Sequence, residues 1–168
     1  MAINKVISFI DKINEWIGNA VCLGLILIAT IGILEVILRY IFSRPTIWAW
    51  DVNEQLFAAV VLLGGGYTLL HNMHIRLDVI YDRCSPRLKA ILDVATFPLF
   101  FLFFIILLWQ GTDMAWSSVK IREVSSSFFA PPIYPLKMCV PIGAFLILLQ
   151  GLANFARDIM SIITKQGK

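Results

Sequence analysis

The chain has 168 residues, of which 59% are hydrophobic and 15% are charged, and its mean hydropathy is +0.81. Because soluble domains carry about 25% charged residues, this composition excludes an ordinary soluble domain. The net charge of +3 is small, and the basic residues are spread over several loops, which excludes the concentrated basic surface of a nucleic-acid-binding protein.

Four apolar segments account for most of the sequence, and each is long enough to cross a bilayer as a helix. They lie at about 16–40, 47–70, 88–116 and 136–159. Because the hydrocarbon core offers no water to the backbone, each segment should be helical. We therefore predict an all-α integral membrane protein with four transmembrane helices, formed by a single membrane domain over residues 1–168.

The first 15 residues have the pattern of an amphipathic helix. Apolar residues recur at steps of three and four from Ile3 to Ile17, and charged residues occupy the other face. This pattern predicts an interfacial helix over 1–15 that lies on the cytoplasmic surface of the membrane, with Trp16 at the turn into the first span. The alternative is that this segment simply extends the first span into water.

The distribution of Lys and Arg predicts the orientation of the chain, because these residues accumulate in cytoplasmic loops. An even number of spans places both termini on the same side. That side, with the second loop, holds nine basic residues, against five in the other two loops. We therefore expect both termini in the cytoplasm.

Three consecutive glycines, Gly64, Gly65 and Gly66, occur in the second span. Consecutive glycines weaken a helix, so their presence needs a reason. Small residues allow helix backbones to approach closely inside a membrane. We interpret these glycines as a site of close packing or bending.

Few ionisable residues lie within the spans. Asp93 and Asp113 fall near the two ends of the third, and a group that includes Asp51 gathers at the predicted outer ends of the first two. Glu35 and Arg39 are four residues apart on one helix face and can form an ion pair, and Glu54 lies in the first turns of the second span. One interpretation is a solvated, self-paired cluster that fixes a helix hairpin. The other is that Glu35, Arg39 and Glu54 contact a partner subunit. No continuous polar face crosses the membrane, which argues against conduction of a substrate by this chain alone.

Two hypotheses from other classes of protein were weighed. A stand-alone, four-helix, proton-coupled transporter would use Glu35, but this residue lies near the end of its span with Arg39 beside it. A haem-binding subunit would need axial ligands that face each other across helices, whereas His71 and His74 belong to one loop. The positions of these residues therefore argue against both hypotheses.

Three sequence segments together resemble a known family. In chain order they are Glu35-Val-Ile-Leu-Arg39-Tyr-Ile-Phe42 followed by Trp48 and Glu54, then His71-Asn-Met-His74-Ile-Arg76-Leu-Asp78, then Pro135-Leu-Lys137 followed by Pro141-Ile-Gly143. This series resembles the DctQ-like small membrane subunit of tripartite ATP-independent periplasmic (TRAP) transporters. The resemblance covers nearly the whole chain.

The resemblance implies a non-enzymatic scaffold subunit in the inner membrane of a bacterium or archaeon. In this family a large membrane subunit contains the substrate and sodium sites and moves like an elevator, and a periplasmic binding protein delivers the substrate. The small subunit packs beside the large one, in contact with membrane lipids, and is implied to help dock the binding protein. The imported solutes would be organic acid anions.

The sodium site belongs to the large subunit, so we expect no catalytic, cofactor-binding or metal-binding residue in this chain. The candidate residues are instead structural or lie at a subunit interface. They are Glu35, Arg39, Trp48, Glu54, Gly64, Gly65, Gly66, His74, Arg76 and Asp78.

Overall fold

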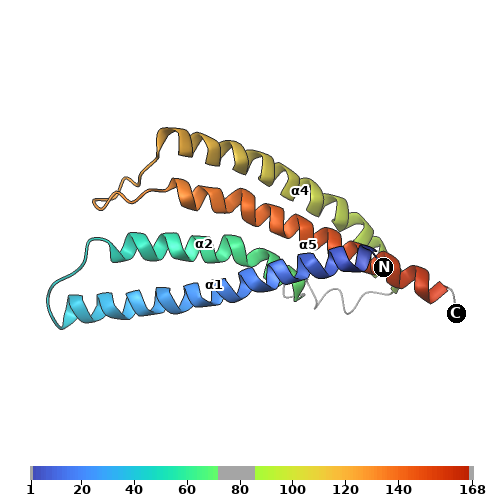
Figure 1. The fold of residues 1–168 in the computed structure, drawn as a ribbon, viewed down its shortest axis with the longest axis horizontal. Helices are drawn as coiled ribbons and strands as arrows, with labels where there is room; N and C mark the ends of the chain where they lie inside the picture. Colours follow the sequence, from blue (N-terminus) through green and yellow to red (C-terminus); the bar gives the residue numbers. More distant parts are fainter. Residues whose placement is uncertain (1, 72–85, 167–168) are drawn as a thin grey trace.

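The computed structural model describes residues 2–71 and 86–166, with side chains over 5–71 and 97–157. Within these ranges the chain forms four α-helices and no strand (Figure 1). The helices are α1 (Ala2–Tyr40), α2 (Ala49–Leu70), α4 (Pro86–Ile121) and α5 (Tyr134–Gln166). The all-helical fold class predicted from the sequence is confirmed.

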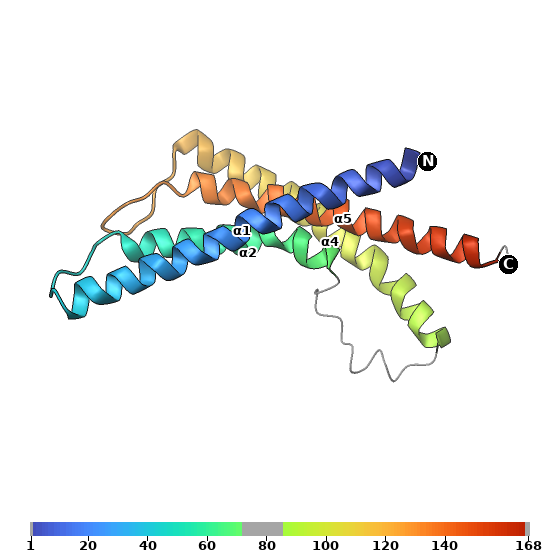
Figure 2. The same cartoon turned by 60° about the horizontal axis from the view of Figure 1, so that its bottom comes forward.

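The helices lie in a row in the order α1, α2, α5, α4. The second helix packs between α1 and α5, and α4 packs against the other side of α5 (Figure 1). Toward the end that holds the termini, α1 also reaches α5. At that same end, the start of α1, the start of α4 and the end of α5 diverge from one another (Figure 2). The two middle helices, α2 and α5, therefore hold the bundle together.

Each of the four predicted spans falls within one of these helices, apart from the two residues 47 and 48 that precede α2. Three segments are long and apolar enough to cross a membrane: Lys5–Tyr40, Phe97–Ile121 and Tyr134–Arg157. The helix α2 is not among them, because polar residues including Asp51 and Glu54 occupy the first turns of its 22 residues. A fourth span through α2 and the cytoplasmic position of the termini remain predictions.

The sequence analysis predicted an interfacial helix over 1–15 that turns into the first span at Trp16. The predicted turn at Trp16 is wrong. The helix α1 continues without interruption from Ala2 to Tyr40. No proline interrupts this helix, and Gly18, the nearest glycine, lies within it against the ring of Tyr67. The early turns also pack on α5, since Asp11 and Asn14 bond to its side chains. The segment thus extends the first span, as the alternative interpretation stated.

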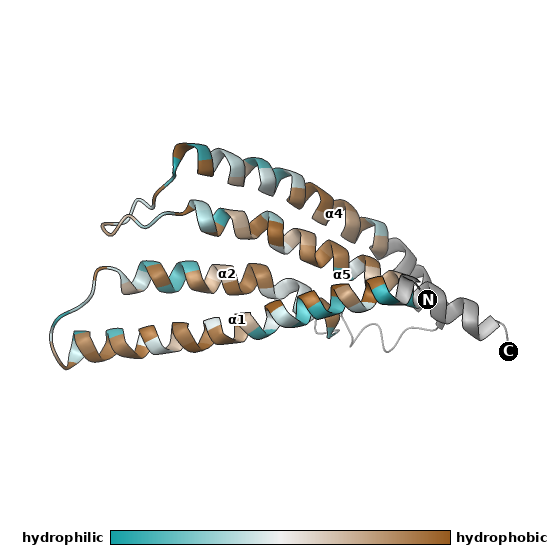
Figure 3. Ribbon diagram, in the orientation of Figure 1, coloured by the Kyte–Doolittle hydropathy of each residue, from teal (hydrophilic) through white to brown (hydrophobic). Residues whose placement is uncertain are grey.

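The outer surface of the bundle is apolar, whereas its small core lies mainly along α5. Ala144, Leu146, Ile147, Leu148 and Ala153 of α5 are buried. Large apolar side chains on α1 and α4 are exposed instead, among them Leu23, Ile26, Ile33, Leu99, Phe103 and Trp109. Figure 3 shows that hydrophobic residues recur along both helices. A soluble protein rarely exposes so large an apolar surface. This distribution is that of a bundle whose outer faces contact lipid or another membrane protein.

Glycines set the spacing of the helices. A Cβ atom at Gly143 of α5 would overlap the backbone carbonyl of Leu62 in α2, and one at Gly65 would lie 2.5 Å from Ile147 Cδ1. A Cβ atom at Gly66 would overlap the side-chain oxygen of Asn14 in α1. Helices in lipid associate largely through such close contacts between small residues. The glycines of α2 therefore lie where its two neighbours approach.

We predict that Gly143→Ala destabilises the bundle by about 1–3 kcal/mol, because the added methyl group meets a backbone atom that cannot rotate away. Gly32→Ala is the matched control, since its Cβ would lie 3.8 Å from Asn53 Nδ2, an ordinary contact. Thermal unfolding in detergent should show a lower Tm for the first variant and an unchanged or higher Tm for the second. Equal Tm values for the two variants would show that α2 and α5 can move apart without loss of stability.

Candidate functional site

The loop between α1 and α2 is fixed by the carboxylate of Glu35. Arg39 donates to Glu35 Oε1 from Nη2 at 2.6 Å and from Nε at 3.1 Å. Thr46 donates to Oε2 from its hydroxyl at 2.5 Å and from its backbone N–H at 3.2 Å. The Thr46 hydroxyl also accepts the N–H of Ala49 at 3.4 Å, in the first turn of α2. Both carboxylate oxygens are therefore engaged, and they join the end of α1 to the start of α2.

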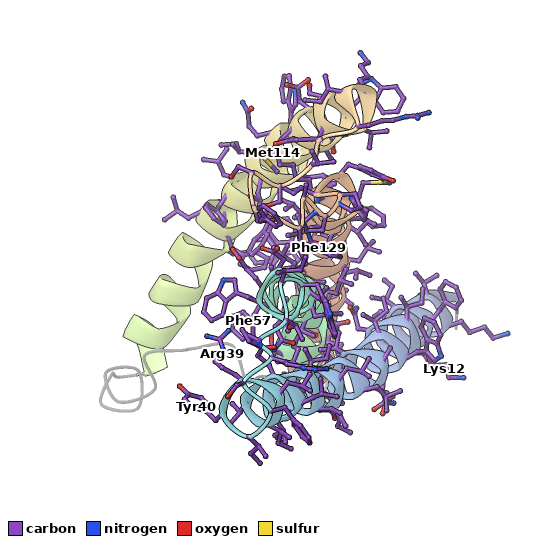
Figure 4. All side chains as sticks on the ribbon, turned by 90° about the vertical axis from the view of Figure 1, so that its left-hand side faces the viewer. Lys12, Arg39, Tyr40, Phe57, Met114 and Phe129 are labelled. Carbon is purple, nitrogen blue, oxygen red and sulfur yellow. The ribbon has the colours of Figure 1, made fainter. Side chains whose placement is uncertain are left out.

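Sequence reasoning found the pair of Glu35 and Arg39 but missed Thr46. The available signal was a threonine shortly before a predicted helix, a position where hydroxyl groups often accept backbone N–H bonds. The side chain of Arg39 is 52% exposed, against 15% for Glu35. The guanidinium therefore holds the loop while presenting part of its surface outward, as seen at the labelled end of α1 in Figure 4.

The remaining candidate residues do not join the ion pair of Glu35 and Arg39. Trp48 precedes α2 and is half-buried. Glu54 is exposed and forms no ion pair with any residue that the structure describes. His74, Arg76 and Asp78 lie outside the described residues. The structure therefore joins Glu35 to Arg39 and leaves Glu54 apart from them.

The loop between α4 and α5, residues 122–133, is a short hairpin at the same end of the bundle. Ile133 N–H donates to the Glu123 carbonyl at 2.9 Å, and Ser125 N–H donates to the Pro131 carbonyl at 2.8 Å. The Glu123 carboxylate pairs with Lys137 Nζ at 2.5 Å. This hydrogen bond from the Lys137 ammonium holds the pKa of Glu123 below its ordinary value of 4.5. Backbone hydrogen bonds and this ion pair thus order the connection between α4 and α5.

A buried polar network joins the early turns of α1 to the later turns of α5, at the end of the bundle opposite the two loops. The sequence analysis did not predict this network. Gln150 of α5 is fully buried and accepts the side-chain N–H of Asn14 at 2.8 Å. It donates to Asp11 Oδ1 at 3.0 Å and to Asn154 Oδ1 at 3.2 Å. Arg157 completes the network through an ion pair with Asp11 and a bond to Asn154.

The buried polar network also includes α2, because Asn154 donates to the Leu69 carbonyl at 3.2 Å. Gly66 leaves the room that Asn14 occupies. Three helices therefore meet at one set of mutually bonded amides and charges. The signal in the sequence was the spacing of Gln150, Asn154 and Arg157, which places three polar side chains on one face of an apolar helix.

The polar groups of the two ends serve packing more than chemistry. Glu35 bonds to Arg39 and Thr46, and Gln150 bonds across to α1, which offsets part of the cost of removing these groups from water. Among the described residues, no group of three or more His, Cys, Asp or Glu side chains could hold a metal ion. The arrangement can hold helices in register and present exposed groups such as Arg39 to a partner.

We predict that Thr46→Val lowers the Tm of the chain, because the carboxylate of Glu35 loses the hydroxyl donor on one of its oxygens. Thr46→Ser keeps this donor and should lower the Tm less. The comparison separates the hydrogen bond from the packing of the side chain. If the valine variant unfolds at the same temperature as the serine variant, the bond contributes nothing.

We predict a pH-dependent contribution from the pair of Glu123 and Lys137. The pKa of Glu123 is lowered in the folded chain, so the pair stabilises the fold above pH 4.5 and its contribution disappears as pH falls through the lowered pKa. The Tm difference between the unmodified chain and Glu123→Gln should therefore vanish in acid. A difference that is the same at pH 7 and in acid would contradict the pair.

Comparison with known proteins agrees with this arrangement. The family described as "Tripartite ATP-independent periplasmic transporters, DctQ component" matches residues 14–160, which include nearly all of both polar sites. The C4-dicarboxylate TRAP transporter small permease protein DctQ of Vibrio cholerae is 29% identical over 121 residues, 67% of this chain and 51% of that protein. The ectoine TRAP transporter small permease protein TeaB of Halomonas elongata is 28% identical over 142 residues, 83% of this chain and 72% of that protein.

A third relative is the sialic acid TRAP transporter permease protein SiaT of Haemophilus influenzae. It is 27% identical over 84 residues, 49% of this chain and only 13% of that protein. The chain thus spans about half of the Vibrio protein and a small part of SiaT. Because the family match extends over most of α1, all of α2 and α4, and most of α5, the chain belongs to the DctQ component family of the tripartite ATP-independent periplasmic transporters.

Proposed function

We propose that this chain is the static scaffold subunit of a sodium-coupled, binding-protein-dependent transporter that imports organic acid anions. The observation that supports a scaffold is the inverted distribution of polarity. Apolar side chains cover the outside of α1 and α4, whereas the polar groups inside bond to one another. Such a molecule can pack against a large membrane subunit but contains little that would bind a hydrophilic solute.

The two polar sites lie at opposite ends of the bundle, and the helices between them meet through apolar residues and glycines. Glu35 bonds near the end of α1, and Gln150 bonds near its start, through Asp11 and Asn14. The intervening contacts are those of Gly24 with Val60 and Gly65 with Ile147. Among the described side chains, no succession of polar groups joins the two ends, which favours a subunit that does not move substrate itself.

The names of two of the three relatives support organic acids as the transported class, and the third is named for ectoine. The Vibrio cholerae protein is named for C4-dicarboxylates and the Haemophilus influenzae protein for sialic acid. Both solutes are acids, although they differ greatly in structure. Since similar small subunits occur with such different solutes, we propose that a large membrane subunit determines selectivity and contains the sodium sites.

The same proposal assigns four spans and cytoplasmic termini to this chain. The buried polar network around Gln150 then lies toward the cytoplasm, and the two loops 41–48 and 122–133 face the periplasm. The exposed part of Arg39 lies on this periplasmic side, where a binding protein would dock. We propose that this end contributes to docking.

The alternative function is a stand-alone proton-coupled transporter that uses Glu35. A proton-carrying carboxylate must lose its partners to take up a proton and must be reached by substrate. Here both oxygens of Glu35 are bonded to Arg39 and Thr46, and the residue lies in the last turns of α1. These contacts favour a structural function for Glu35.

Co-purification tests the scaffold proposal. With a tag on its C-terminus, the chain should be recovered after gentle solubilisation with a much larger polytopic membrane protein in equal amount. Reconstitution of that complex with its binding protein should give sodium-dependent uptake of an organic acid. Recovery of the chain alone, or as a dimer of itself, would contradict the proposal.

We predict that Glu35→Gln preserves uptake in the assembled complex, with at most a reduced yield, because the scaffold does not exchange protons. Arg39→Glu, which places two carboxylates beside each other, should reduce the yield more than Arg44→Glu in the neighbouring loop. The measurements are complex yield and initial uptake rate. Loss of uptake by Glu35→Gln at unchanged yield would favour the proton-coupled alternative.

A further inference from the structure

The hairpin 122–133 exposes a large aromatic side chain at its tip. Phe128 is 94% exposed, although its backbone neighbours are held in place. Ser127 donates from its hydroxyl to Asp51 Oδ2 at 2.8 Å, and Ala130 N–H donates to the Ser127 carbonyl at 3.1 Å. Ala130 adopts a left-handed conformation with φ of 49°. The loop therefore presents Phe128 outward in a defined position, and this exposure in water would be unfavourable.

The bond from Ser127 to Asp51 fixes the depth of this phenylalanine. Asp51 lies in the first turn of α2, directly after Trp50, which is 80% exposed. Phe128 is therefore level with the start of α2 and with an exposed tryptophan. Tryptophan side chains concentrate at the boundary between lipid headgroups and acyl chains. If α2 spans the membrane, as proposed above, Phe128 lies at this boundary.

Basic residues around the start of the hairpin also suit the boundary between lipid headgroups and acyl chains. Lys120 and Arg122 are exposed, and the Lys120 ammonium lies 5.6 Å from the centre of the Trp116 ring. Glu123, the acidic residue that follows them, is neutralised by Lys137. Lys120 and Arg122 thus offer exposed positive charge beside an aromatic ring, which matches the phosphate groups and glycerol region of a phospholipid layer.

We propose that the hairpin 122–133 inserts Phe128 into the outer headgroup region of the bilayer, with Lys120 and Arg122 at the phosphate groups. The loop then anchors the end of the bundle in lipid, beside the two helices that it connects. This inference rests on the proposed span through α2 and goes beyond the scaffold function, because it assigns a lipid contact to a loop that would otherwise face the periplasm.

Nitroxide labels at single cysteines test this inference, in a chain with Cys22, Cys84 and Cys139 replaced by serine. The sites are Phe128→Cys, Ser126→Cys as the neighbouring polar control, and Phe57→Cys, which is exposed on α2 (Figure 4). The chain is placed in nanodiscs of phosphatidylethanolamine and phosphatidylglycerol. Collision of each label with oxygen, which concentrates in lipid, is compared with collision with a water-soluble nickel complex.

The expected result is a ratio of oxygen to nickel collisions that is several times higher at 128 than at 126 and lower than that at 57, which lies deeper along α2. A ratio at 128 equal to that at 126, with 57 in lipid, would overturn the inference and leave the scaffold proposal intact. A label at 57 that meets the nickel complex would overturn the span through α2 and the inference with it. The measurement is repeated in the complex with the large subunit, where protection of 128 from both reagents would show a protein contact and overturn the lipid contact.

Discussion

The close approach of α2 and α5 at Leu62 and Gly143 is the contact on which the rest of the bundle depends. Helices surrounded by lipid gain little from the hydrophobic effect when they associate, because the acyl chains are as apolar as the side chains. Their association then depends on contacts that only small residues permit. Here the absence of a side chain at Gly143 lets the backbones of the two middle helices meet. With this pair in place, α1 packs on α2 and α4 packs on α5, which gives the row seen in Figure 1.

Polar side chains then hold the ends of the row. At one end, Gln150 joins Asn14 and Asp11 of α1 to α5, and Asn154 reaches the last turns of α2. At the other end, Glu35 joins α1 to the residues that begin α2. Buried amides and carboxylates are costly unless they are fully bonded, so each site favours one register of the helices over its neighbours. The bundle is therefore fixed at both of its ends.

The functional interpretation follows from the separation of bonded polar groups inside the bundle and apolar faces on its outside. The side chains of Glu35, Gln150 and Asn154 are bonded within the chain, whereas its apolar faces on α1 and α4 lack partners among the described residues. We propose that a protein of this kind offers its apolar faces to lipid and to a large membrane subunit. The DctQ family match and the Haemophilus influenzae permease, which is much longer than this chain, agree with such an assembly.

The sequence by itself determined the class of the protein. The length of the apolar segments requires helices in lipid, and the short motifs around Arg39 and Pro141 indicated the family, which the comparison confirmed. The pair of Glu35 and Arg39 was also predictable, because a spacing of four residues places both side chains on one helix face. The sequence misled at Trp16, where a change from amphipathic to apolar pattern resembled a break. Only the tertiary structure decided that α1 continues, that Asp11 and Asn14 face α5, and that Ser127 meets Asp51. These contacts join residues that are 76 to 139 positions apart, and the periodicity of a single helix contains no information about which face of a distant helix it will meet.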